Sequence, residues 1–138
     1  MPHLRSLRTQ LRKGHCSEFL SNEEDAILDA GDNAMMFFAR KYLRYYHNKG
    51  LDFVGRFNKK LVIGEAKFLT DFGGHQNAQF NDAISTIEVE GVDAVKVAIL
   101  DGVLYIEGKN KMFKAITEEY RNHNIMSALV FREFLYQI

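Results

Sequence analysis

The stretch LDFVGRFNKKLVIGEAKF, residues 51–68, determines the fold that the sequence predicts. Two extended apolar segments, 51–57 and 60–68, flank the pair Asn58-Lys59. Short runs of this kind, rich in Val, Ile and Phe and separated by two residues, are typical of strands joined by a tight turn. The stretch therefore predicts an antiparallel β-hairpin.

The same turn sets which residues face each other across the hairpin. If Asn58-Lys59 is a two-residue turn, Asp52 lies opposite Glu65, with Cβ atoms about 5 Å apart. Lys67 follows Glu65 by two residues, so the pleat turns it to the same face. A slip of one residue would send these groups to opposite faces. The expected register brings two carboxylates and one ammonium group together.

Such a cluster favours one kind of chemistry. Two carboxylates this close repel, and one takes up a proton unless a cation lies between them. Mg²⁺ is bound in proteins through one or two carboxylates together with phosphate oxygens and water, and a lysine beside it can orient a water aimed at phosphorus. The alternative is a salt-bridged patch on a half-exposed hairpin. The apolar strand around Glu65 and Lys67 favours a functional site, because buried charges need partners.

Helical periodicity and turn signals surround this hairpin. Asp101-Gly102 between apolar runs is typical of a second hairpin, over 95–106. Ile125, Leu129, Phe134, Leu135 and Ile138 are expected to face the core from the last helix. Helices are predicted over 3–13, 75–88, 111–121 and 124–138. Another is predicted to start at Glu23, capped by Ser21 or Asn22, and a further one to run from a cap at Asp32 or Asn33 to about His47. Mixed strands flanked by helices predict an α/β (α+β) fold.

Length and composition agree with one domain over 1–138. The chain has 138 residues, 46% of them apolar, and equal numbers (18 each) of basic and acidic side chains. No apolar run reaches the roughly 18 residues that span a bilayer, and no signal-type stretch opens the chain, so we expect a cytoplasmic protein without membrane contact. Residues 1–17 form a basic N-terminal segment that either packs on the domain or lies peripheral to it. Such charge blocks either form a face for phosphates or a solvated surface.

A resemblance to known enzymes rests on the same residues. Asp52 followed by a strand that ends Glu65-Ala66-Lys67 resembles the signature of the PD-(D/E)XK nuclease superfamily. Longer stretches are similar to a group of type II restriction endonucleases, and the resemblance covers about residues 23–138. These stretches are KGLDFV at 49–54, GEAKFLTDFGGHQNAQ at 64–79, ILDGV at 99–103, IMSAL at 125–129 and REFL at 132–135.

The resemblance implies a restriction-endonuclease-like core, a central mixed β-sheet flanked by helices. It implies Mg²⁺-dependent hydrolysis of phosphodiesters in double-stranded DNA, with Asp52 and Glu65 as metal ligands and Lys67 beside the attacking water. Cutting both strands of a short, near-symmetric site calls for two active centres, so we expect a homodimer. Two features depart from the family pattern. Leu51 replaces the usual proline, and two strands are found where the core has three before its helix.

The segment after the catalytic strand supplies candidate DNA contacts. Gly73-Gly74 permits close backbone approach, and the following helix is expected to direct its N-terminal amides back towards the site. Gln76, Gln79, His75 and Gly74 are the DNA-binding candidates, with an ordinary polar helix start as the alternative for Gln76 and a surface histidine for His75. A further acid from upstream, Glu18, Glu24, Asp25 or Asp29, is a candidate for the metal site.

Two other functions remain open at this stage. One is a structure-specific repair or recombination nuclease with the same core. The other is a non-catalytic DNA-binding or assembly module, because the chain is short for a restriction enzyme with its own base-reading elements and has the length expected of a fragment or a shortened homologue. Cleavage at a defined sequence, cleavage at DNA structures or ends, and binding without cleavage distinguish the three.

Overall fold

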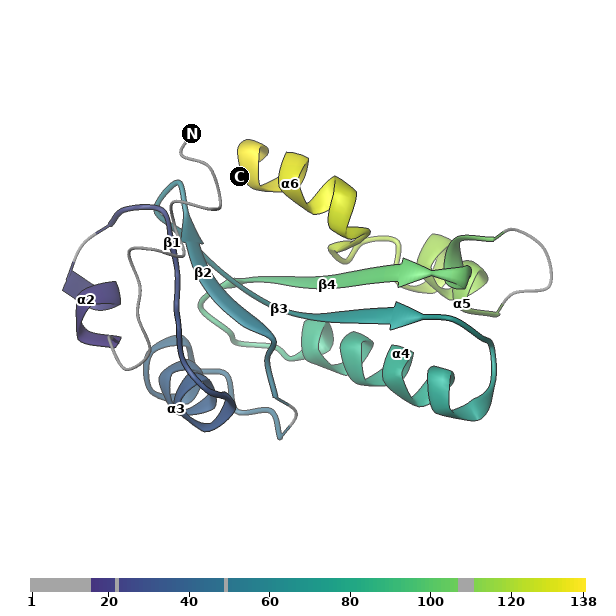
Figure 1. The fold of residues 1–138 in the computed structure, drawn as a ribbon, viewed down its shortest axis with the longest axis horizontal. Coiled ribbons are helices and arrows are strands. Elements are labelled where there is room, and N and C mark those ends of the chain that lie inside the picture. Colours follow the sequence, from purple (N-terminus) through teal and green to yellow (C-terminus); the bar gives the residue numbers. More distant parts are fainter. Residues whose placement is uncertain (1–15, 22, 49, 107–110) are drawn as a thin grey trace.

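A five-stranded mixed sheet lies between helices in the computed structural model, which describes residues 16–21, 23–48, 50–106 and 111–138 (Figure 1). The strands, in the order β1-β2-β3-β4-β5 across the sheet, are β1 Ala26–Ile27, β2 Phe53–Phe57, β3 Lys60–Leu69, β4 Val95–Gly102 and β5 Ile125–Met126. The helices are α2 Cys16–Ser21, α3 Asp32–Leu43, α4 Gly74–Glu88, the 3₁₀ turn η1 Val103–Tyr105, α5 Lys111–Lys114, the π-helical turn η2 Ala115–Glu119 and α6 Ala128–Gln137. The predicted mixed α/β class is confirmed. The helix predicted over 3–13 lies outside the described residues.

The β2–β3 hairpin has the predicted register, with Phe57 paired to Lys60 and Phe53 to Gly64. Asn58 and Lys59 both adopt left-handed conformations, with φ of 51° and 66°, as a type I′ turn requires. Contacts from outside the hairpin support the turn. The Asn58 backbone N–H donates to Asp25 Oδ1 (2.7 Å), and its side-chain amide donates to the carbonyl oxygen of Ile138 (2.9 Å).

Replacing Lys59 with glycine should stabilise the fold by about 0.5–1 kcal/mol, because glycine adopts φ above zero without the steric cost that a Cβ brings. Lys59 pairs with Glu23 at 3.8 Å, but both side chains are about three-quarters exposed, so loss of this ion pair costs little. Urea unfolding measures the change. Lys59→Ala, which removes the ion pair but keeps the Cβ, is the control and should show no gain; an equal gain in both variants would contradict the explanation.

The helix predicted to start at Glu23 is wrong, because this segment contains the short strand β1. Ala26 pairs with Arg56 of β2, so three strands precede α4 where the sequence predicts two. The buried Arg56 guanidinium explains the difference: it donates to the carbonyl oxygens of Glu24 (2.9 Å) and Phe19 (2.7 Å). Carbonyl groups held by this side chain favour an extended path over a helical turn.

The second hairpin, predicted at Asp101-Gly102, is also wrong. β4 continues to Gly102, which pairs in parallel with Leu69 of β3, and a 3₁₀ turn follows instead of a return strand. Gly102 has a φ of 106°, and a Cβ there would lie 1.9 Å from the carbonyl oxygen of Leu69. The glycine therefore serves a close approach of two parallel strands.

Two predicted helices are shorter than expected at one end. α3 ends at Leu43, before His47, and its N-cap is Gly31. α6 begins at Ala128, after β5, with the side chain of Ser127 accepting from the Val130 N–H at 3.2 Å. As a result Leu129, expected in the core, is 86% exposed, whereas Leu135 is buried.

The helices divide between the two faces of the sheet. α3 and α4 cover one face, and α6 lies on the other (Figure 1). On β3, Ile63 packs in the cluster of α3 and Leu69 in the cluster of α4. Because side chains alternate along a strand, Glu65 and Lys67 lie between these two apolar clusters, on the face that α3 and α4 cover.

Candidate active site

Glu65 is the buried acid of the hairpin, with 6% of its surface exposed. Burial raises the pKa of its carboxyl group, because an apolar environment disfavours the charged form. The charge of Lys67 opposes this shift, and those of Asp52 and Asp82 add to it; a hydrogen bond from Thr86 favours ionisation. The net direction is upward, so this carboxyl group is short of compensating positive charge.

Asp52 and Lys67 lie on either side of Glu65. The Asp52 N–H donates to the Gly64 carbonyl oxygen (2.9 Å), just before the first residue of β2, and the charge of Asp52 acts on the Glu65 carboxyl group. Its Oδ2 accepts from the Ala66 N–H at 2.7 Å, while the side chain stays exposed. Lys67 Nζ lies 3.8 Å from Glu65 Oε1. The structure thus brings together the three predicted site residues.

Two buried polar residues near Glu65 belong to no recognisable motif in the sequence. Thr86, in the last turn of α4, is fully buried and donates through Oγ1 to Glu65 Oε2 at 3.3 Å. Tyr45, just after α3, is also fully buried and forms a side-chain hydrogen bond with Thr86. Burial raises the pKa of Tyr45. The sequence feature that could have indicated Thr86 is its position beside Ile87, on a helix face otherwise made of apolar residues.

The further acid near the site comes from downstream. Asp82, one turn before Thr86 on α4, raises the pKa of Glu65 through its charge. Asp25 instead holds the turn at the opposite end of the hairpin, about 17 Å from Asp52 at 3.4 Å per residue. Glu24 lies near that same end, where its carbonyl oxygen accepts from Arg56. Asp29 is exposed after β1, and the side chain of Glu18 lies outside the described part of the chain.

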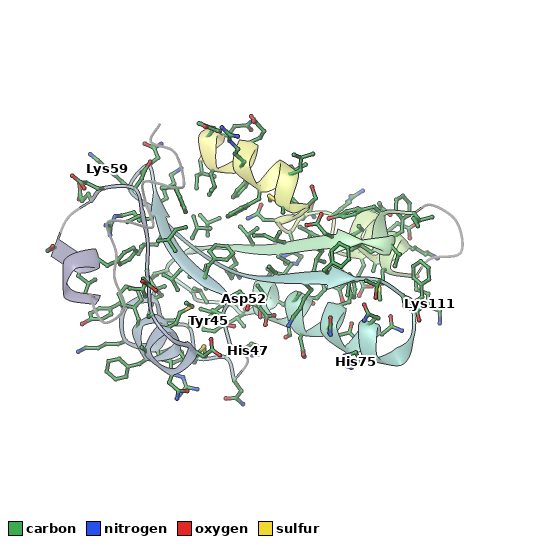
Figure 2. All side chains as sticks on the ribbon, in the orientation of Figure 1. Tyr45, His47, Asp52, Lys59, His75 and Lys111 are labelled. Atoms are coloured by element: carbon green, nitrogen blue, oxygen red, sulfur yellow. The ribbon has the colours of Figure 1, made fainter. Side chains whose placement is uncertain are left out.

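The candidate DNA-binding residues gather at the start of α4, where Figure 2 labels His75. Gly74 and His75 are exposed, and His75 Nε2 lies 3.1 Å from Gln79 Nε2. Gln76 Oε1 accepts from the Thr70 N–H at 2.9 Å, which ties the helix to the end of β3. This arrangement is compatible with both interpretations of Gln76.

The expectation that the N-terminal amides of α4 point back to the carboxylates is wrong. Gly74 precedes Thr86, the helix residue beside Glu65, by twelve positions, or about 18 Å along the helix. β3 and β4 are parallel, so the connecting helix must return antiparallel to them. Its last turns therefore cover Glu65, and its start lies at the far end of β3.

The donor atoms of the site suit a hard divalent cation. Two carboxylates supply oxygen ligands, and the raised pKa of Glu65 marks a place where added positive charge is favourable. Within the described residues, no group of three or more His, Cys, Asp or Glu side chains is arranged to hold a metal. A cation bound here would therefore complete its coordination with water and phosphate oxygens, as Mg²⁺ does.

Comparison with known proteins assigns the chain to a family. Within the described part of the chain, no helix is both long and apolar enough to cross a membrane. No curated protein and no solved structure matches the chain. The family model of the Tsp45I type II restriction enzyme matches residues 8–138, and enzymes of this kind bind DNA and generally use a divalent metal. The chain therefore belongs to the Tsp45I type II restriction enzyme family and is a site-specific deoxyribonuclease.

Proposed function

We propose that the chain is a Mg²⁺-dependent endonuclease of PD-(D/E)XK type that cuts both strands of double-stranded DNA at a short specific site. The observation that carries this proposal is the proximity of Asp52 and Lys67 to Glu65 on the hairpin. Asp52 is exposed and Glu65 is buried, so the cluster is open to a DNA phosphate on one side and anchored in the core on the other.

In this proposal Asp52 and Glu65 bind Mg²⁺, with water and phosphate oxygens as further ligands. Held by these two residues, Mg²⁺ would supply a lowered water pKa and positive charge beside the phosphate. The Ala66 N–H holds one oxygen of Asp52 in a fixed direction. Lys67, beside Glu65 on the same strand face, orients the attacking water and offsets negative charge as the leaving oxygen departs.

The proposed DNA contacts of Gly74, His75, Gln76 and Gln79 lie away from the attacked phosphate. The distance of about 18 Å along α4 equals roughly five rises of 3.4 Å in B-DNA. A Cβ at Gly74 would meet nothing within 4 Å, so the helix start is sterically open. Gln76 uses its amide oxygen within the protein, and its NH₂ group is the part that can donate to a phosphate or a purine N7.

A homodimer completes the proposal. One copy carries one Asp52–Glu65–Lys67 cluster, and cleavage of both strands at a near-symmetric site calls for two clusters related by a two-fold axis. The proposed location is the cytoplasm, where such an enzyme meets its DNA substrate. Sedimentation with and without a short DNA duplex measures the state of association.

Incubation with supercoiled plasmid in Mg²⁺ tests the function. Discrete linear fragments are expected with the natural sequence and should disappear in Ca²⁺ alone and in Lys67→Ala. Lys60→Ala, on the same strand but at the exposed turn, is the matched control and should cleave normally. Fragments at DNA ends or junctions would favour a repair or recombination nuclease. Salt-sensitive binding without any cleavage would favour a non-catalytic module.

A further inference from the structure

Three polar side chains meet inside the core on the helix side of the hairpin. Glu65 is 6% exposed, and Thr86 and Tyr45 are fully buried. Thr86 Oγ1 donates to Glu65 Oε2 at 3.3 Å and forms a side-chain hydrogen bond with Tyr45. The three groups form a chain that leads from the segment after α3, through α4, to the carboxylate on β3.

Core packing alone does not explain these residue types. A buried hydroxyl group costs free energy unless it is hydrogen-bonded, whereas valine and phenylalanine, which have nearly the shapes of Thr86 and Tyr45, carry no such requirement. The apolar clusters on either side contain residues of that kind. The polar atoms therefore point to a requirement at Glu65, whose carboxylate accepts from Thr86.

The two oxygens of Glu65 have different partners. Lys67 Nζ lies 3.8 Å from Oε1, and the Thr86 hydroxyl donates to Oε2. Contacts at both oxygens restrict rotation of the carboxyl plane about the end of the side chain. A carboxylate fixed in this way keeps a constant direction towards an incoming cation, which is how residues behind a ligand commonly raise metal affinity.

The Thr86 hydroxyl group has Tyr45 as a further hydrogen-bond partner. Thr86 has one hydroxyl proton and two acceptors within reach, Glu65 Oε2 at 3.3 Å and the Asp82 carbonyl oxygen at 3.2 Å. A hydroxyl oxygen can accept while it donates, so an O–H donated by Tyr45 would leave the threonine proton for Glu65 Oε2. Tyr45 is itself held by its backbone N–H, which donates to the Ala39 carbonyl oxygen at 3.1 Å.

A second contact fixes the same segment against α4. His47 Nε2 lies 3.1 Å from Ser85 Oγ, and the rings of Tyr45 and His47 pack edge to face with centroids 6.0 Å apart. Figure 2 shows Tyr45 and His47 together near the end of α3. The segment after α3 is thus tied to the last turns of α4, which keeps the Tyr45 hydroxyl near Thr86.

From this geometry we propose that Thr86 and Tyr45 are positioning residues that orient the Glu65 carboxylate for binding a divalent cation. Thr86 contacts the proposed ligand directly, and Tyr45 acts through Thr86. The inference rests on the proposed function, because it assumes that Glu65 binds the metal. It adds two residues that belong to neither the hairpin motif nor the predicted DNA contacts.

Metal binding without DNA provides the test. Mn²⁺, which is paramagnetic, is titrated into the full chain and free Mn²⁺ is followed by electron paramagnetic resonance; Mg²⁺ competition gives the second affinity. Thr86→Val should weaken both affinities about tenfold or more, and Thr86→Ser, which keeps the hydroxyl, should recover most of the loss. Tyr45→Phe should weaken them by a smaller factor, about threefold. Cleavage of plasmid should need correspondingly more Mg²⁺ in each variant.

Thr117→Val is the matched control. Thr117 Oγ1 donates to the Phe113 carbonyl oxygen at 2.8 Å, four residues back, which reproduces the local bond of Thr86 without the carboxylate. This variant should bind metal normally.

Equal affinity in Thr86→Val and the natural sequence, or no recovery in Thr86→Ser, would overturn the inference while leaving the proposed function intact. Absence of Mn²⁺ binding by the natural sequence would overturn both. If Thr86→Val does not fold, the metal affinities of Thr86→Ser and Tyr45→Phe still test the inference. An unchanged affinity in Tyr45→Phe would contradict the role given to Tyr45. A tenfold weaker affinity in Thr86→Ser would contradict the role given to Thr86.

Discussion

Glu65→Gln should abolish DNA cleavage and at the same time make the metal-free protein more stable at neutral pH. Glutamine keeps the size of the side chain and can still accept a hydrogen bond from Thr86, so the fold is retained. It removes the negative charge that the proposed metal site requires. Loss of a charged group aimed at the reacting centre costs about 10³-fold in rate, and loss of the cation itself adds to this.

The gain in stability follows from the raised pKa of Glu65, whose largest cause is burial. The pKa of this carboxyl group is higher in the folded protein than in the unfolded chain, where it is near 4.5. Below pH 4.5 the group is protonated in both states, so the fold keeps its full stability. Stability is then lost as the pH rises through the folded-state pKa. Glutamine does not titrate, so the variant escapes this loss. The two proteins should differ little near pH 4, and the variant should be the more stable above the raised pKa.

Thermal unfolding across pH 4–8, with and without Mg²⁺, measures this effect, together with plasmid cleavage. Mg²⁺ should stabilise the natural sequence, because it binds the folded state, and should leave Glu65→Gln unchanged. Glu88→Gln, an exposed glutamate at the end of α4, is the control and should retain both activity and pH dependence. A variant that is active, or less stable than the natural sequence at pH 8, would contradict the role given to Glu65.

Gly102→Ala should be among the most destabilising single substitutions in the chain. Its Cβ would lie 1.9 Å from the Leu69 carbonyl oxygen and 2.8 Å from the carbonyl carbon, and backbone atoms cannot move aside as a side chain can. The φ of 106° adds strain for any residue with a Cβ. Loss of the β3–β4 pairing at this end should lower the free energy of unfolding by about 4 kcal/mol or more.

Two other glycines separate the steric clash from the backbone strain. Gly91 has a φ of 74° but open space around it, and Gly50 has open space and no positive φ. Gly91→Ala should cost about 1 kcal/mol, and Gly50→Ala should be close to neutral. Urea unfolding of the three variants should give the order Gly50, Gly91, Gly102 with increasing loss. A similar loss for Gly91→Ala and Gly102→Ala would assign the effect to φ alone.

The hairpin and the cluster on it are predictable from local sequence patterns. The register of residues 51–68 depends on a two-residue turn and on alternation along each strand, and both are local properties. The positions of Asp52, Glu65 and Lys67 follow from that register. The buried face of α4 was also predictable, since Phe80, Ala83, Ile84 and Ile87 repeat at helical spacing and are all buried.

Features that depend on distant partners could not be predicted in this way. β1 is a strand because Arg56, some thirty residues away in the sequence, donates hydrogen bonds to carbonyl groups of the segment before it. Asp101-Gly102 continues a strand because β3 lies beside it and demands a residue without a Cβ. Thr86 and Tyr45 reach Glu65 because the parallel β3–β4 pair sends α4 back over the sheet. Local patterns cannot carry such information, since the interaction energies that decide these positions come from residues far along the chain.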